Sequence, residues 1–177
     1  MKLLLLSLTI SLTSFAQSYT ASQIKEISIK ATDSGEVRKE LKAFSQTGNY
    51  EVYMEFNNLK DKPVKVGPIP SKTKIGNKNA IVMTAPLPDG NTFYMLITYD
   101  EKLEVYHKFL LGPDDKPIKM TGLSKDHKTV AWSLVSPSGE VTLSQEKNTL
   151  NGSEWYSVTM KDGKIIKTEK GSAKFKK

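Results

Sequence analysis

Alternation with a period of two, interrupted at short intervals by tight-turn residues, constrains the fold of this chain more than any other feature. Between Tyr50 and Phe56 the even-numbered residues are apolar or aromatic, while Glu51 and Glu55 are acidic. This is the pattern of a strand with one buried face. Similar segments follow at 80–85, 92–99, 103–111, 118–121, 129–135, 140–145, 155–160 and 164–168, and a short last strand is predicted at 172–175.

Turn residues separate these segments and leave little room for other elements. Pro-Asp-Gly at 88–90, Pro-Ser-Gly at 137–139 and Asp-Gly at 162–163 are typical of tight turns between antiparallel strands. The one long connection, 60–79, contains three prolines and is expected to be irregular. We therefore predict an all-β protein with a short N-terminal helix. Its up-and-down antiparallel meander of eight to ten strands, at 49–177, either closes into a barrel or splits into a β-sandwich.

Residues 17–48 precede the strands and carry a helical pattern. Val37, Leu41 and Phe44 fall on one face of a helix, and Gly48 is suited to end it. The stretch at 24–29 fits either a helix or a strand, because its apolar residues satisfy both periods. We expect this helical segment to fold as one unit with the strands that follow.

The first sixteen residues have the pattern of a cleavable signal peptide. Lys2 supplies a positive start and is followed by an apolar run that ends near Phe15. Small residues come just before the expected cleavage site, between Ala16 and Gln17. The run is too short to span a bilayer, so no transmembrane anchor is expected. We predict that the cleaved protein is periplasmic or secreted.

Composition narrows the chemistry further. The chain has no cysteine, which excludes a disulfide framework, a thiol nucleophile and a thiolate metal site. Its net charge of +7 comes almost entirely from lysine, because Arg38 is the only arginine. Lysine lacks the planar fork with which arginine reads bases, so nucleic-acid binding is not expected. The lysine-dense stretches at 60–78 and 161–177 indicate either an anionic envelope surface as a partner or an ordinary solvated surface.

No recognisable catalytic or metal-binding set is present. His127 lies in a predicted turn, whereas His107 lies on a predicted strand and shares its face with Phe109 and Leu111. A metal site requires at least three ligands, and two histidines on separate elements do not supply them. We therefore expect a non-enzymatic protein without metal or cofactor.

Three segments of the chain resemble the lipocalin, or calycin, class. Gly48-Asn49-Tyr50 follows a short helix and opens the first strand, where that class carries Gly-x-Trp. The run 98–106, and the Asp-Gly-Lys at 162–164 before a lysine-rich last strand, resemble exported bacterial lipocalin-like domains of uncharacterised function. The resemblance implies a small calycin-like barrel with one open end and an apolar cavity. It implies no catalytic residues, since that class mostly binds ligands.

The inward-facing side chains of such a barrel would form its binding site. We predict a small apolar ligand, held in the open end of the barrel by Tyr50, Phe93, Met95, His107 and Trp132. His107 would supply a hydrogen bond to the ligand, or it is a core histidine satisfied by its neighbours. Two alternatives remain: a barrel filled by its own side chains, and an envelope structural or interaction module that uses its lysine-rich surface.

Overall fold

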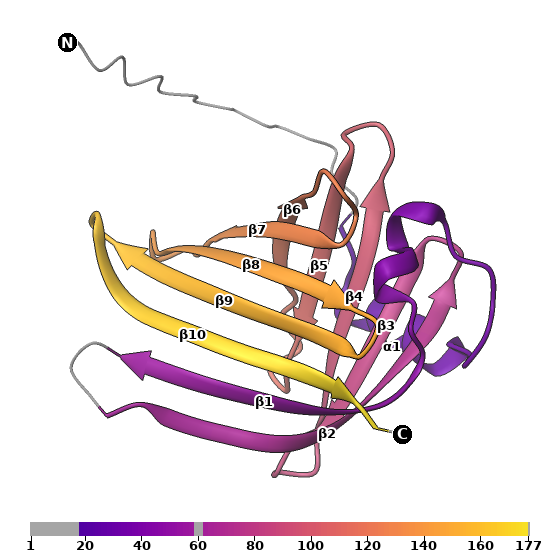
Figure 1. The fold of residues 1–177 in the computed structure, drawn as a ribbon, viewed down its shortest axis with the longest axis horizontal. Coiled ribbons are helices and arrows are strands. Elements are labelled where there is room, and N and C mark those ends of the chain that lie inside the picture. The colour runs from indigo at the N-terminus through magenta and orange to yellow at the C-terminus, as the bar shows by residue number, and fades with distance from the viewer. Residues whose placement is uncertain (1–17, 59–61, 177) are drawn as a thin grey trace.

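The computed structural model describes residues 18–58 and 62–176, and their strands form one closed antiparallel barrel (Figure 1). Each strand pairs with its neighbour in the sequence, and β1 closes the ring against β10. The strands are β1 (Gly48–Asn58), β2 (Val64–Asn77), β3 (Ala80–Pro86), β4 (Thr92–Asp100), β5 (Val105–Leu111), β6 (Ile118–Leu123), β7 (Thr129–Val135), β8 (Val141–Thr149), β9 (Gly152–Lys161) and β10 (Lys164–Phe175). The predicted up-and-down meander is confirmed, and the β-sandwich is excluded because the sheet closes on itself.

Most strands lie where the alternation places them. β7 coincides with the predicted segment at 129–135, and β3 and β4 extend their predicted segments by a single residue. The C-terminal region differs, because the two strands predicted at 164–168 and 172–175 form the single strand β10, which continues through Gly171. The predicted signal peptide at 1–16 lies outside the described residues, as does Gln17.

β2 is the clearest departure from the sequence prediction. The expected irregular connection at 60–79 is wrong, because most of it is a strand. Pro68 and Pro70 lie in the part of β2 that pairs with β1, whereas pairing with β3 begins only at Lys72. The missing N–H of a proline is tolerated in a stretch that has a neighbouring strand on one side only. The prolines therefore mark a one-sided stretch of the wall, and they do not mark a loop.

Two short helices precede the barrel. α1 (Ala21–Lys30) begins at a capping box. The Gln23 N–H donates to the Thr20 hydroxyl at 3.3 Å, and the Thr20 N–H donates to the Gln23 side chain at 2.9 Å. The stretch at 24–29 is thus a helix. The second helical piece is the short 3-10 helix η1 (Lys39–Phe44). In the described part of the chain, no helix is long and apolar enough to cross a membrane.

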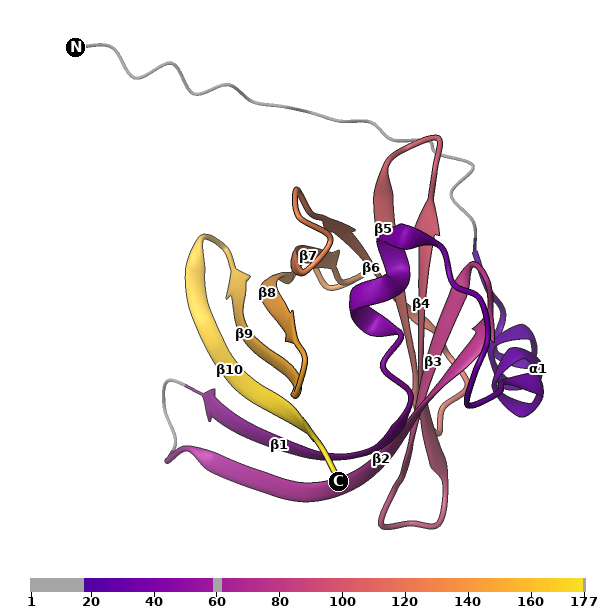
Figure 2. The ribbon, with the colours of Figure 1, turned by 45° about the vertical axis from the view of Figure 1, so that its right-hand side comes forward.

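The two helices lie on opposite sides of the wall. Figure 2 shows α1 against the outer surface of the barrel, beside β3. Ile24 of α1 is fully buried there against outward-facing residues that include Leu96, Phe109 and Leu111. In contrast, Leu41 of η1 packs with the inner residues of the barrel. As a consequence, parts of β3 and β4 are covered by α1 on the outer face and by η1 on the inner face.

Candidate functional site

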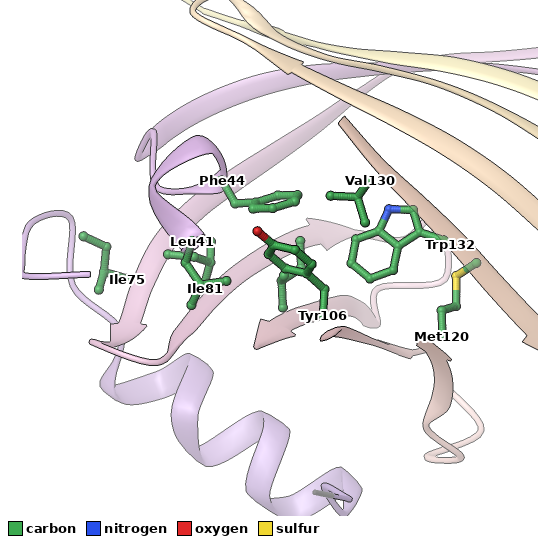
Figure 3. Packing of buried hydrophobic residues seen from close by; sticks show 9 residues of the cluster. Leu41, Phe44, Ile75, Ile81, Tyr106, Met120, Val130 and Trp132 are labelled. Carbon is green, nitrogen blue, oxygen red and sulfur yellow. The ribbon is translucent and has the colours of Figure 1, made fainter. Parts of the chain in front are cut away.

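One end of the barrel is closed by η1 and a cluster of aromatic side chains (Figure 3). The ring centroid of Phe44, in η1, lies 5.7 Å from that of Tyr106 on β5 and 6.4 Å from that of Trp132 on β7. Tyr106 and Trp132 meet edge to face at 6.2 Å. Together with Leu41, these three aromatic residues form what we call the floor of the barrel.

Hydrogen bonds and ion pairs hold η1 in this position. The Tyr106 hydroxyl donates to the main-chain oxygen of Glu40 at 3.0 Å, and it lies 2.7 Å from Nδ1 of His127 in the β6–β7 turn. Burial raises the pKa of Tyr106, so its hydroxyl keeps the proton that it donates. Arg38 pairs with the side chain of Glu40 and with Glu101 in the β4–β5 turn. The start of η1 is therefore tied to β5 and to the β4–β5 turn.

Beyond the floor the barrel contains a cavity of about 440 Å³. This volume falls within the range of small-molecule binding sites. The cavity extends from the floor toward the end of the barrel that carries the β3–β4, β5–β6, β7–β8 and β9–β10 connections.

The cavity has an apolar wall, contributed by β1 to β7. Its side chains are those of Val52, Met54, Ile69, Met83, Ala85, Leu87, Phe93, Met95, Leu110, Met120 and Leu134. Methionine is unbranched and polarizable, so it adapts to ligands of irregular shape. The methionines make this wall suited to an apolar ligand without dictating its outline.

The opposite side of the cavity, contributed by β8 to β10, is polar. Its hydroxyl and charged side chains are those of Thr142, Ser144, Glu146, Ser153, Ser157, Thr159, Lys167 and Glu169. Two of the hydroxyls, on Thr142 and Thr159, hydrogen-bond to each other across β8 and β9 at 3.0 Å. We call this surface the polar wall.

A buried ion pair lies at the inner end of the polar wall, next to the floor. Lys108 on β5 pairs with Glu146 on β8, and their side chains are only 12% and 8% exposed. The same Glu146 oxygen, Oε2, accepts a hydrogen bond from Nε1 of Trp132 at 3.0 Å. The Lys108 ammonium lies 4.3 Å from the centroid of the Trp132 ring. These three residues form the inner triad.

A second group of the same composition lies elsewhere on the polar wall. Nε1 of Trp155 donates to Oε1 of Glu169 at 3.0 Å, and Lys167 lies 3.7 Å from the other oxygen of Glu169. This outer triad is more open to solvent, since Lys167 is 38% and Glu169 24% exposed. Each triad joins one cation, one carboxylate and one indole, so each is close to neutral as a unit.

Both tryptophans lie over a glycine of the neighbouring strand. Gly122 is opposite Trp132, and Gly171 is opposite Trp155. A Cβ added at Gly122 would lie 2.5 Å from the Trp132 ring, and one added at Gly171 would lie 2.1 Å from the Trp155 ring. The two glycines therefore make the space in which the indoles reach their carboxylates.

Four of the five predicted site residues face the interior. Phe93 and Met95 line the main cavity, and Trp132 belongs to the floor. Tyr50 lines a smaller recess of about 50 Å³ beside Phe44. Its hydroxyl donates to the main-chain oxygen of residue 46 at 2.7 Å, and burial raises its pKa to about 12.

His107 lies on the outer face of the wall, so the expectation that it lines the cavity is wrong. The inward side chains of β5 include Lys108 and Leu110, whereas His107 shares the outer face with Phe109 and Leu111. The apolar character of that face comes from its contact with α1. His107 is 2% exposed, and neither of its ring nitrogens has a hydrogen-bond partner in the described part of the chain.

The charged residues of the cavity were not predicted from the sequence. Alternation places Lys108 and His107 on opposite faces of β5. The face that carries His107 is apolar, so the sequence predicts that it points inward, whereas it points outward. Glu146 and Glu169 carried no signal of an inward position. In β8 the apolar residues Val141 and Leu143 lie on the outer face, and β10 is largely polar on both faces. Trp155, which does alternate, lines the cavity as well.

The fold and the site define a closed up-and-down β-barrel with a plugged end and an internal cavity. Over residues 18–58 and 62–176, no group of three or more histidine, aspartate and glutamate side chains is placed to hold a metal ion. Comparison of the sequence with models of known protein families gives no match, and neither does comparison with curated proteins.

Proposed function

We propose that this protein binds a small, predominantly apolar molecule inside its barrel, and that it acts by binding and not by catalysis. The observation that carries the proposal is the cavity of about 440 Å³, which is bounded by the apolar wall on one side and by the floor below. A barrel stabilised only by its own packed side chains would fill such a space, because empty volume forfeits packing energy.

The proposal extends to the class and location of the protein. The closed antiparallel barrel is compatible with a lipocalin-like protein, and the Gly48-Asn49-Tyr50 segment at the start of β1 supports that assignment. The apolar run at 1–16 supports export to the periplasm or to the exterior.

Displacement of an apolar fluorescent probe tests the proposal. We expect saturable binding of one probe molecule per chain to the wild-type protein, and weaker binding to an Ala85→Phe variant. Ala85 lines the cavity, so the larger ring takes up space that the probe requires. The matched control is Ala131→Phe, because Ala131 is exposed.

Circular dichroism and thermal unfolding show whether both variants keep the fold. Equal probe affinity in two folded variants would place the binding site outside the cavity and contradict the proposal. Absence of saturable binding to the folded wild-type protein would also contradict it.

The lysine-rich surface is the basis of the alternative, an interaction module for an anionic envelope component. Several lysines of the two lysine-dense stretches pair with carboxylates at 3.0 to 3.9 Å, among them Lys65, Lys72, Lys161, Lys170 and Lys176. These pairs offset part of the local positive charge, whereas the cavity has the volume and the apolar lining of a binding site. Salt-sensitive association with anionic vesicles that persists in the Ala85→Phe variant would favour the alternative.

A further inference from the structure

The inner triad places charged groups in the lining of the cavity, where a purely apolar ligand would give them no hydrogen-bonding partner. Lys108 and Glu146 both line the cavity, next to the floor, and both side chains are nearly buried. Charged groups at such a depth are costly unless they are paired and hydrogen-bonded.

The triad keeps unused hydrogen-bonding capacity. An ammonium group has three donors, and a carboxylate offers about four acceptor positions. The described contacts of Glu146, from Lys108 and from Trp132, meet at the single oxygen Oε2. A donor and an acceptor are therefore available side by side at the inner end of the cavity.

The charge of the triad limits the kind of group that can bind there. Lys108 and Glu146 already neutralise each other, so an anionic or cationic head group would bring one uncompensated charge into a site of low polarity. A hydroxyl or a primary amide both donates and accepts a hydrogen bond, and it brings no charge. Such a group matches the pair without that cost.

We propose that the ligand is an uncharged amphiphile, whose hydroxyl or amide group binds Lys108 and Glu146 while its apolar chain lies along the apolar wall. In this arrangement Met95, Leu110 and Met120 contact the part of the chain nearest the head group. This inference rests on the proposed function, since it names the ligand class of the same cavity.

Competition among three probes of equal chain length tests the inference. Dodecan-1-ol, dodecanoate and dodecylammonium are each used to displace the fluorescent probe at pH 8, below the solubility limit of the alcohol and the micelle concentrations of the two ions. We expect dodecan-1-ol to bind the wild-type protein more tightly than either charged compound, on the order of tenfold, the usual effect of a hydrogen bond to a charged group. Tighter binding of dodecanoate or of dodecylammonium would overturn the inference.

The Lys108→Met/Glu146→Gln variant assigns the preference to the inner triad. Both new side chains are uncharged, and the glutamine can still accept the hydrogen bond of Trp132. We expect this variant to lose most of the preference for the alcohol over the two charged compounds, whatever the change in its affinity for the fluorescent probe. The matched control, Lys167→Met/Glu169→Gln, makes the same replacements in the outer triad and should keep that preference.

Tryptophan emission supplies a second measurement, because the chain has only two tryptophans. In a Trp155→Phe variant the signal comes from Trp132 alone, and saturation with dodecan-1-ol should change its emission. An unchanged preference in the inner double variant, or its loss only in the outer one, would overturn the inference while leaving the proposed function intact. Failure of the apolar probe itself to bind would overturn the proposed function and this inference together.

Discussion

The hydroxyl of Tyr106 donates a hydrogen bond to the main-chain oxygen of Glu40, and this contact joins strand β5 of the barrel wall to the helix that closes its end. The two residues are separated by 66 positions in the sequence, and their hydrogen bond keeps the Glu40 oxygen inside the barrel. Buried carbonyl groups rarely remain unpaired, since each lost partner carries a desolvation cost. The contact therefore fixes where the floor lies and how deep the cavity extends.

Removing that hydroxyl should loosen the floor. We expect Tyr106→Phe to lower the free energy of unfolding by about 1 to 3 kcal/mol, because the ring still packs but the carbonyl of Glu40 loses its donor. Urea unfolding followed by circular dichroism measures the loss. Tyr156→Phe, at a tyrosine that is 52% exposed, is the control and should change the value by less than about 0.5 kcal/mol. Equal effects of the two changes would refute the role given to the Tyr106 hydroxyl.

The glycines beneath the two tryptophans should not tolerate a methyl group. We expect Gly122→Ala and Gly171→Ala each to destabilise the protein by about 1 to 3 kcal/mol, because the added carbon would overlap an indole ring. Thermal unfolding and near-ultraviolet circular dichroism report the loss of stability and the displaced ring. Gly112→Ala is the control, since the nearest atom to its Cβ is 3.8 Å away. Wild-type unfolding curves for both core variants would contradict the described packing.

Breaking the inner ion pair should cost more than removing it completely. We expect Lys108→Met alone to destabilise the protein by about 3 to 5 kcal/mol, because Glu146 is left buried without its cation. The Lys108→Met/Glu146→Gln variant should recover most of that loss. Lys167→Met, at the more exposed outer triad, should cost no more than about 1 kcal/mol. The free energies of unfolding of the three variants form the measurement, and a double variant as unstable as Lys108→Met would count against the pairing.

His107 should make stability fall on mild acidification. Burial, followed by the nearby charge of Lys119, lowers the pKa of His107 below its usual value, although Asp100 opposes this shift. In the unfolded chain the imidazole has a pKa of about 6.5. The unfolded state therefore binds the extra proton first as the pH drops below that value, and the free energy of unfolding decreases from there down to the lower folded-state pKa.

Replacement of His107 by leucine isolates this contribution. We expect the loss of stability between pH 7.5 and pH 5.5 to be smaller in His107→Leu than in the wild-type protein, since the other titrating groups are common to both. Urea midpoints at the two pH values give the comparison. Parallel pH dependence in the two proteins would show that His107 does not carry the effect.

The architecture could be predicted from the sequence because strand alternation and turn chemistry are local signals. β7 coincides with the segment predicted at 129–135, and most other strands lie between the predicted turns. The error at β2 has a structural cause: prolines argue against a strand only where both of its sides are paired, and Pro68 and Pro70 lie where one side has no neighbour. Whether β2 has a neighbour on that side depends on the length of β3, and the sequence of β2 carries no information about that length.

The binding cavity could be predicted only in part. Alternation sorts the residues of β5 into two faces, but the rule that the apolar face points inward fails where a helix covers the outside. The outer face of β5 is apolar because it packs against α1. The alternation rule therefore predicts His107 in the cavity, where the structure has Lys108. The partners of Lys108 come from β7 and β8, and their convergence depends on the curvature and register of the whole barrel.

The closure of the ring between β1 and β10 has a consequence for how the chain reaches its folded state. Every other pair of strands is a hairpin between neighbours in sequence, whereas the pairing that joins Tyr50 to Phe175 brings together nearly the two extremes of the sheet. Contacts between distant residues form slowly, because the entropy of a long loop is lost before they are gained. Until β10 docks, β1 and β9 each present an unpaired edge on which another chain can add a strand. Docking of β10 therefore covers the two edges through which a partly folded chain would associate with its own copies.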